Sequence, residues 1–260
     1  MPRQARRVNP QGYYHVMMRG NNRHPIFGRP DDKAYYLKVL QEHCCEDTLA
    51  IVAYCLMDNH VHLVLHAASD AFSRALSRTN LKFALRYNTR QKHCGHVFQD
   101  RFRSEIIDEP RYLLAAIRYV HNNPVKAKLV NAPRDYRWSS YQEYVSESTI
   151  IDKELMVSVL AEYFNGDVSK FIAFHRQHDE HEFLEDRVDL ELQRLERGQR
   201  VLLAFCESYG IENPKEAYRN PELLATLTHY LIENSRLSHR QVAELLGVSS
   251  SRIHRVASRQ

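Results

Sequence analysis

The sequence lacks several features that would place it in common classes of protein. No hydrophobic run approaches the ~20 residues of a membrane span, and no apolar stretch follows the basic N-terminus MPRQARRVNP, which argues against secretion. Repeats, low-complexity tracts and glycine- or serine-rich linkers do not occur, and no two cysteines have CxxC spacing. The five cysteines are Cys44, Cys45, Cys55, Cys94 and Cys206. This usage predicts reduced thiols in a cytoplasmic protein, and neither a disulfide framework nor a zinc knuckle.

Charge is unevenly distributed along the chain. Residues 1–150 hold 22 Lys and Arg against 14 Asp and Glu, residues 151–235 hold 9 against 17, and residues 236–260 hold 5 against 1. A basic first part, an acidic middle and a basic end suggest two segments that face nucleic acid, separated by one that does not. Solvated faces of uneven charge would give the same counts, so charge alone does not decide between the two readings.

Hydrophobic patterning predicts an α+β fold followed by helices. The expected strands lie at 12–20, 49–57, 58–65 and 104–108, and the expected helices begin near 31 and cover 71–90 and 110–123. Pro124 is expected to stop the third helix. The β-α-β-β-α order with a further strand and helix is typical of a ferredoxin-like antiparallel sheet with helices. We divide the chain into an α+β domain (1–148), a helical acidic spacer (149–198) and an all-α domain (199–260).

The C-terminal stretch LSHRQVAELLGVSSSRIHRV resembles a helix-turn-helix. Ser238 is expected to cap the first helix, and residues 247–249 to form the turn. The second helix is basic, and its residues expected to contact DNA are Ser250, Ser251, Arg252 and Arg255. An ordinary helical hairpin is the alternative.

The segment DNHVHLVL (58–65) places His60 and His62 two residues apart in a β-forming run. Residues two apart on a strand share a face, so both imidazoles should project from the same side of the sheet. Neutral imidazoles bind divalent metals, but two ligands are not a complete site. Structural histidines would give the same pattern.

The third expected helix carries the groups that could complete such a site. Tyr119 and Asn123 are four residues apart and therefore share a helix face. The Asn123 carboxamide oxygen could be the third metal ligand, and the Tyr119 phenol could attack a phosphate held there to form a covalent phosphotyrosine. Tyr112, seven residues earlier, is the rival nucleophile but has no amide or carboxylate four residues after it. A buried core tyrosine is the alternative for either residue.

Two sets of basic residues are candidates for contact with DNA. One recurs every four residues along the second expected helix and consists of Arg74, Arg78, Lys82 and Arg86, continuing to Arg90. Because no acidic residue alternates with it, the stripe suits a phosphate backbone, although a solvated helix face is the commoner explanation. The other set could hold a single strand between aromatic residues and consists of Arg19, Arg23, Arg101 and Arg103.

Several spaced motifs together resemble the single-tyrosine HUH transposases of the insertion-sequence and REP-associated group. These motifs are YYHVMMRGNNR, IVAYCLMDNHVHLVL, GHVFQDRF, RYVHNNPVKA and RDYRWSSYQEY, and they cover residues 10–145 nearly continuously. The resemblance is to the REP-associated branch in particular, because Asn123 stands where the insertion-sequence branch commonly has glutamine. Asp58 stands where many relatives have proline. The C-terminal region is similar to helix-turn-helix tails found on some REP-associated members.

The resemblance implies a ferredoxin-like catalytic domain that uses Mg²⁺ or Mn²⁺ and acts on single-stranded DNA with REP-like hairpins. It implies His60, His62 and Asn123 as metal ligands and Tyr119 as nucleophile. We expect no membrane partner, either a monomer or a homodimer, and contact with duplex DNA through the helix-turn-helix. The alternatives are a domesticated DNA-binding protein that does not cut, and a metal-dependent hydrolase without a covalent step.

Overall fold

A computed structural model describes residues 12–47, 49–67, 71–147, 149–177, 183–211, 218 and 220–257. The chain divides into two compact units, Met1–Leu184 and Glu185–Gln260, and each is described here by itself. Among the described residues, no helix has both the length and the apolar character that a membrane crossing requires.

Unit 1 is built on a four-stranded antiparallel sheet with the order β2-β3-β1-β4. The strands are β1 (Tyr13–Arg19), β2 (Ala50–Leu56), β3 (His60–His66) and β4 (Arg103–Ile107). The predicted α+β class, its antiparallel sheet and all four strands are confirmed, with ends shifted by one or two residues. The turn at Asp58 and Asn59 joins β2 to β3 and sets the register of the hairpin.

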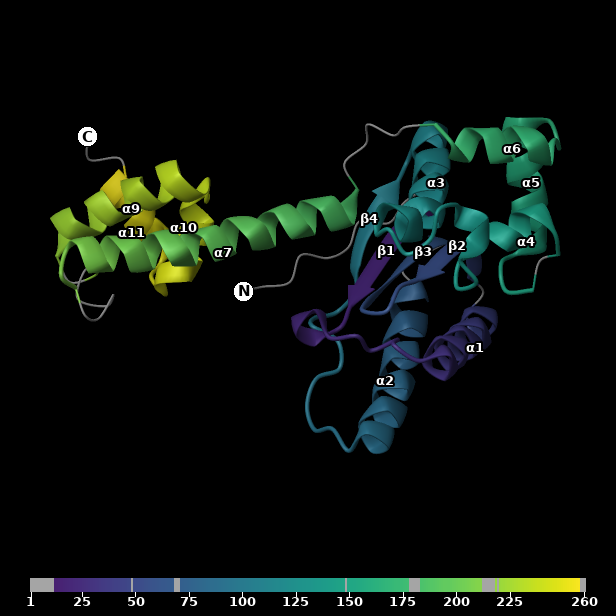
Figure 1. Cartoon of the computed structure of the whole chain (residues 1–260), viewed down its shortest axis with the longest axis horizontal. Coiled ribbons are helices and arrows are strands. Elements are labelled where there is room, and N and C mark those ends of the chain that lie inside the picture. Colours follow the sequence, from purple (N-terminus) through teal and green to yellow (C-terminus); the bar gives the residue numbers. More distant parts are fainter. Residues whose placement is uncertain are drawn as a thin grey trace. The chain divides into compact units, whose positions relative to one another are not determined.

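One face of the sheet is apolar and is covered by two helices, α1 (Pro30–Glu46) and α2 (Ala71–Gln91) (Figure 1). Val61, Leu63 and Leu65 of β3 are fully buried there. The Tyr36 hydroxyl of α1 reaches the Met18 sulfur of β1, and the two helices pack against each other. Because period-two alternation sends these side chains to one side, the histidines of β3 must face the other.

That second face is covered by α3 (Pro110–Lys126), as Figure 1 shows. Pro110 occupies the first helical position, where its missing N–H costs nothing. The prediction that Pro124 stops this helix is wrong, because the helix continues to Lys126. Proline so close to a C-terminus removes a single intrahelical bond, and the last turn still forms, with the Ala127 N–H donating to the Asn123 carbonyl.

Residues beyond 148 continue unit 1, so the structure divides the chain differently from the predicted spacer at 149–198. The remaining elements of this unit are η1 (Asn21–Arg23), η2 (Pro133–Asp135), α4 (Tyr141–Val145), α5 (Lys153–Phe164) and α6 (Val168–His175). Phe164 and Phe171, from α5 and α6, are buried in the core that the sheet forms. The Glu143 carboxylate accepts bonds from the N–H groups of residues 149–151 and from the Tyr54 hydroxyl, which ties the segment to β2.

Unit 2 is helical and has its own apolar core. Its helices are α7 (Leu184–Ser208), α9 (Pro221–Ser235), α10 (His239–Leu246) and α11 (Ser250–Ala257). The Ser238 side chain accepts from the Gln241 N–H in a capping box, as expected for the predicted N-cap. Gly247 ends α10 in the left-handed conformation at φ 65°, and Leu246 and Ile253 are buried on either side of the turn.

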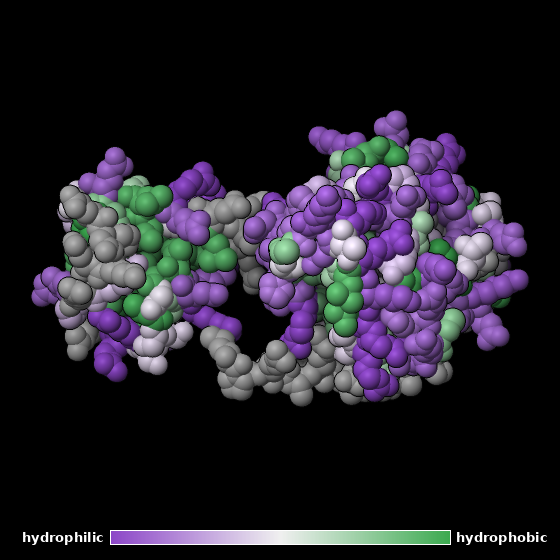
Figure 2. Space-filling view, turned by 90° about the horizontal axis from the view of Figure 1, so that it is seen from below, coloured by the Kyte–Doolittle hydropathy of each residue, from purple (hydrophilic) through white to green (hydrophobic). Residues whose placement is uncertain are grey.

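The face of unit 1 that Figure 2 shows is mostly hydrophilic, with small hydrophobic areas between charged side chains. The exposed large apolar residues of α2 are Leu81 and Leu85, each 61% exposed. Single exposed leucines of this kind are ordinary on a globular surface.

Candidate active site

The register of the sheet gathers polar side chains on the face under α3. Arg19 of β1 lies opposite His60 of β3, and Met17 lies between His62 and Arg103 of β4. Residues directly opposite in an antiparallel pair share a face. His60, His62, Arg19 and Arg103 therefore project from the same side of the sheet.

Helix α3 brings the other two predicted residues to these histidines. The Asn123 Oδ1 lies 3.2 Å from the His60 Nε2. The Tyr119 ring stands edge-on to the His62 ring, with centroids 5.4 Å apart and an interplanar angle of 89°. The imidazole rings of His60 and His62 are 5.0 Å apart. All four residues are buried, Tyr119 being 8% exposed. The structure thus brings together the four residues selected from the sequence.

The donor atoms at His60 fit a divalent cation. The His60 Nδ1 lies 2.6 Å from the Asn59 Oδ1, the nearer of its two carbonyl neighbours, and when Nδ1 donates to that oxygen Nε2 carries a lone pair. That lone pair and the Asn123 carbonyl oxygen converge at 3.2 Å. Two adjacent ligands of one octahedral ion, each about 2.1 Å from it, lie about 3.0 Å apart. No three His, Cys, Asp or Glu side chains cluster as a metal site within the described parts of the chain, so the amide oxygen would have to contribute.

The rival tyrosine is directed elsewhere. The Tyr112 hydroxyl donates a short bond of 2.5 Å to the Glu105 carboxylate on the edge strand β4. Glu105 lies opposite His15 in the sheet, whereas His62 lies opposite Met17. The Tyr119 ring contacts His62 directly.

Three residues at the site were not selected from the sequence. His15 of β1 contacts His62 through its ring nitrogen, and the Lys126 ammonium lies 5.3 Å from the centroid of the Tyr119 ring. Phe183 stacks on Tyr119 with centroids 4.1 Å apart and is 1% exposed. His15 had a signal in the sequence, because it is a polar residue in a strand and in phase with Met17 and Arg19. Phe183 had none, being 64 residues beyond Tyr119.

Asp58 is hydrogen-bonded to α1. Its carboxylate accepts a 2.6 Å bond from the Lys33 ammonium. Lys33 is buried on α1 and also donates to the Tyr136 hydroxyl at 3.3 Å. The residue therefore anchors the β2–β3 turn to α1.

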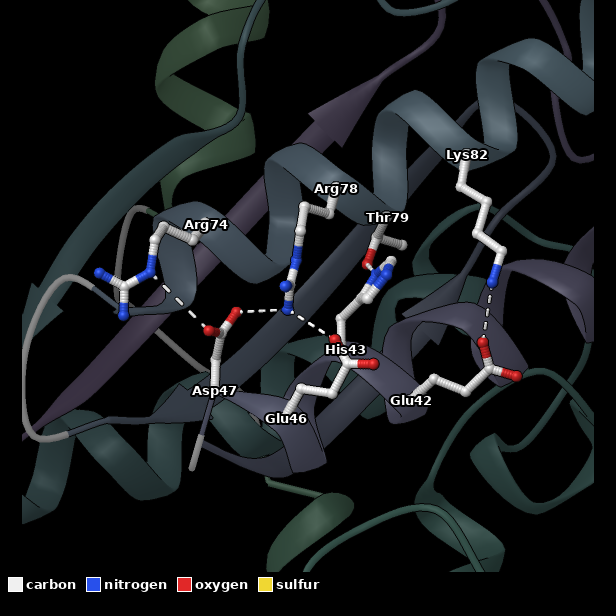
Figure 3. Close-up of polar contacts among 8 residues, drawn as sticks. All are labelled: Glu42, His43, Glu46, Asp47, Arg74, Arg78, Thr79 and Lys82. Atoms are coloured by element: carbon white, nitrogen blue, oxygen red, sulfur yellow. Dashed lines mark hydrogen bonds and ion pairs between the residues drawn. The ribbon is translucent and has the colours of Figure 1, made fainter.

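No acidic residue alternates with the basic stripe within α2, but α1 and its C-cap Asp47 supply acidic partners to it (Figure 3). Arg74 and Arg78 form ion pairs with Asp47 at 3.7 and 2.8 Å. Lys82 bonds to Glu42 at 3.0 Å, and this bond raises the pKa of Lys82 and lowers the pKa of Glu42.

Contacts between α2 and α1 continue along the rest of α2. The Arg86 guanidinium lies over the Tyr35 ring at 4.1 Å, and Arg90 is ion-paired with the buried Asp32. The acidic partners lie 27 to 58 residues away in sequence, so the pattern within α2 could not reveal them. The lack of acidic residues alternating with the stripe favoured a phosphate backbone over a solvated face, and these partners remove that argument. A role of the stripe in DNA binding remains a prediction.

The second set of arginines lies at one end of β1. Arg19 is buried, and its carbonyl accepts from the Gln99 N–H, while Gly20 pairs with Phe98. Arg23 follows in η1, and Arg101 lies in the loop that this pairing holds against β1. Arg23, Arg101 and Arg103 are exposed. Arg19 and Arg103 share the face of the histidines.

In unit 2, α11 exposes the four residues expected to contact DNA, which are Ser250, Ser251, Arg252 and Arg255. Arg252 donates to the Tyr218 carbonyl, so part of its guanidinium is already bonded within the unit. The Arg255 side chain lies three residues further along α11 and shares its exposed face.

The residues of this site lie in a part of the chain that matches a known family. Residues 9–123 match the family described as IS200-like transposases, a span that includes His60, His62, Tyr119 and Asn123. The chain is also similar to the solved structure of a REP-associated tyrosine transposase bound to a REP hairpin, with 16% identity and a TM-score of 0.50. That similarity covers 71% of this chain and 96% of the other, and it concerns the fold. No curated protein sequence matches the chain.

Proposed function

We propose, from the match of residues 9–123 to the IS200-like transposases, that this protein nicks single-stranded DNA at repeat hairpins and transfers the strand through a 5′-phosphotyrosine. The observation that carries the proposal is the convergence of His60 Nε2 and Asn123 Oδ1, 3.2 Å apart, beside a histidine whose ring contacts Tyr119. A phenol next to a pair of cation-binding atoms is the arrangement that phosphoryl transfer to tyrosine requires.

His60, His62 and Asn123 would hold one Mg²⁺ or Mn²⁺, which when bound neutralises and orients the scissile phosphate. The Tyr119 Oη attacks phosphorus and forms the P–O bond, while the bond from phosphorus to the 3′ oxygen breaks. The phenolic proton is lost, and the leaving 3′ oxygen takes up a proton. Because the free phenol has a pKa near ~10, the neighbouring charge must favour the phenolate as it attacks, and the Lys126 ammonium over the ring would assist.

Strand transfer is the reverse reaction at the phosphotyrosine bond. A 3′ hydroxyl of another strand attacks the phosphotyrosine, forms the new phosphodiester and returns the phenol to Tyr119. One phosphate ester is exchanged for another in each step, so the reaction needs no ATP. A hydrolase would instead lose this bond energy by using water as the nucleophile.

DNA would reach the site along the arginines at the end of β1. Arg19 and Arg103 share the face of the histidines, and Arg23 and Arg101 lie on the adjacent loops. The fold of the chain is similar to that of a transposase bound to a REP hairpin, so we propose a hairpin with a single-stranded flank as substrate. Ser250, Ser251, Arg252 and Arg255 of α11 would contact duplex DNA in the manner of a helix-turn-helix.

One observation favours a second candidate, a DNA-binding protein that does not cut. Tyr119 is 8% exposed and lies beneath Phe183, so a phosphate reaches the phenol only if local side chains move. A protein that kept the fold to bind repeats, without cutting them, would be compatible with such burial.

The experiment incubates labelled single-stranded hairpin oligonucleotides with the protein and Mn²⁺ and separates the products on a denaturing gel. We expect a covalent protein–DNA adduct that is lost in Tyr119→Phe and kept in Tyr112→Phe, the matched control on the same helix. Cleavage that survives Tyr119→Phe would identify a hydrolase. Binding of the hairpin without adduct or cleavage would identify the non-cutting protein.

A further inference from the structure

A contact between two fully buried histidines adjoins the proposed metal ligands. The His15 Nε2 lies 3.1 Å from the His62 Nδ1, and both side chains are 0% exposed. Their rings are nearly parallel, with centroids 5.3 Å apart and an interplanar angle of 22°. The distance and burial identify a hydrogen bond shielded from water.

The sheet determines this contact. His15 of β1 lies opposite Val64, and His62 is the diagonal neighbour two residues along β3. Diagonal neighbours on one face lie within reach of aromatic side chains. The pairing of β1 with β3 runs from Tyr13 to Arg19 without a shift in register, so the two rings meet on a rigid backbone.

Only one of the two facing nitrogens can carry the proton in this bond. A histidine that binds a metal through one ring nitrogen almost always donates its other N–H to a neighbouring acceptor, which sets the tautomer and the ring orientation. His62 can present the lone pair of Nε2 to an ion only if its proton is on Nδ1. His15 must then accept at Nε2.

We propose that His15 is a positioning residue that accepts the Nδ1–H of His62 and thereby holds the Nε2 lone pair of His62 ready for the metal. The inference rests on the proposed function, in which His62 is a ligand. His15 does not touch the ion or the DNA in this role. It acts through His62 alone, as the Asn59 carboxamide acts on His60.

A packing role for His15 makes different predictions. The His15 ring also lies edge-on to Tyr119 and Phe183, at 5.9 and 6.2 Å. If His15 only packs against these two rings, His15→Phe would preserve the contacts and leave the proton position on His62 unchanged. If the acceptor at position 15 matters, His15→Phe should disturb the tautomer of His62. His15→Gln should restore that tautomer, because the glutamine side chain carries an acceptor oxygen.

The first measurement requires no variant. Long-range ¹H–¹⁵N correlation spectra of the metal-free, ¹⁵N-histidine-labelled full chain report the tautomer of His62. We expect the proton on Nδ1. A proton on Nε2 would overturn the proposal, even if the covalent adduct with DNA forms normally. Conversely, a missing adduct together with an Nδ1 proton would refute the proposed function and leave this tautomer assignment intact.

The second measurement is the affinity for Mn²⁺ alone, followed by electron paramagnetic resonance of the free ion. We expect binding to weaken about 10–100-fold in His15→Phe and to recover in His15→Gln. His66→Phe is the matched control, since His66 lies on the same strand and face as His62 but its ring is tilted against Tyr13. Equal affinities of wild type and His15→Phe would contradict the proposal.

Discussion

Two clusters of buried histidines in the described part of unit 1 have different surroundings. His15, His60 and His62 lie on the sheet face under α3, next to a carboxamide and a phenol. His121 and His175 lie 2.9 Å apart between α3 and α6, where His121 also contacts the Ser140 hydroxyl at 2.8 Å. The second pair is surrounded by Tyr141, Tyr144 and Phe171, so it has the character of a core.

Burial makes the second pair sensitive to acid. Desolvation lowers the pKa of His175 to about 4, and desolvation together with His175 lowers the pKa of His121 well below its usual value. The unfolded chain binds these protons near pH ~6.5, whereas the folded protein does not. The stability that depends on these neutral imidazoles is therefore fully present above pH ~6.5. It is lost as the pH falls towards their pKa in the folded protein.

We expect the free energy of unfolding to fall between pH 7 and pH 5, with His175 accounting for about 2 kcal/mol of the loss. Urea titrations at the two pH values should show a smaller loss in His175→Gln than in the wild type. His93→Gln, at an exposed histidine, should lose as much as the wild type. Equal losses in wild type and His175→Gln would refute this assignment.

At the scale of elements, α2 shows how a helix face can be misread. Its five basic residues satisfy every local criterion for a phosphate-binding stripe, yet each contacts a residue of α1 or its C-cap Asp47. Exposed pairs such as Lys82 with Glu42 contribute little to stability, and their charges largely cancel for a distant phosphate. Arg103 stands on β4, on the sheet face of the histidines, and is the better candidate for contact with DNA.

The affinity for a single-stranded hairpin should depend on Arg103 and not on Lys82. We expect Arg103→Ala to weaken binding and to reduce the slope of log affinity against log salt by about 0.7, the value for one phosphate on a single strand. Lys82→Ala, the matched control, should leave both affinity and slope unchanged. Fluorescence anisotropy at several salt concentrations measures both quantities. A larger effect of Lys82→Ala would restore the stripe as a DNA-binding surface.

Most elements could be predicted from the sequence because their causes are local. Alternating apolar residues define β3, Pro110 marks the start of α3, and Ser238 with Gly247 delimits α10. Spacing within those elements also sufficed to place Tyr119 and Asn123 on one face.

The rest depends on contacts between residues distant in sequence. Asp47 neutralises Arg78 across 31 residues, and Phe183 reaches Tyr119 across 64. The packing of α5 on β2 and of α6 on α3 likewise leaves no mark in composition, which is why an acidic spacer was predicted where unit 1 continues. Such contacts become visible only when the tertiary arrangement is known.

At the scale of the whole molecule, the chain has two separate apolar cores. Unit 1 buries the sheet with α1 to α6, and unit 2 buries α7, α9, α10 and α11 around Leu227, Leu231 and Ile253. All residues of the candidate active site belong to the first. A unit with its own core can fold by itself.

A chain that ends at residue 190 should therefore keep the chemistry. We expect it to melt cooperatively and to form the same covalent adduct with hairpin DNA as the full chain, while it loses the binding of duplex DNA that we propose for α11. Gel analysis of the adduct and titration with duplex DNA test the two parts. Failure of the shortened chain to form the adduct, while it remains folded by circular dichroism, would show that unit 2 contributes to catalysis.

The seven residues of β3 serve two purposes at once, because cation-binding and apolar side chains alternate along one backbone. Val61 and Leu63 lie in the same peptide segment as His60 and His62. A substitution that makes this strand slide by one residue would exchange the two faces, turning both imidazoles into the apolar layer. Mutational scans of β3 should therefore find inactive variants at apolar positions that do not contact the nucleic acid. In these variants the altered register of the strand would misplace the histidines.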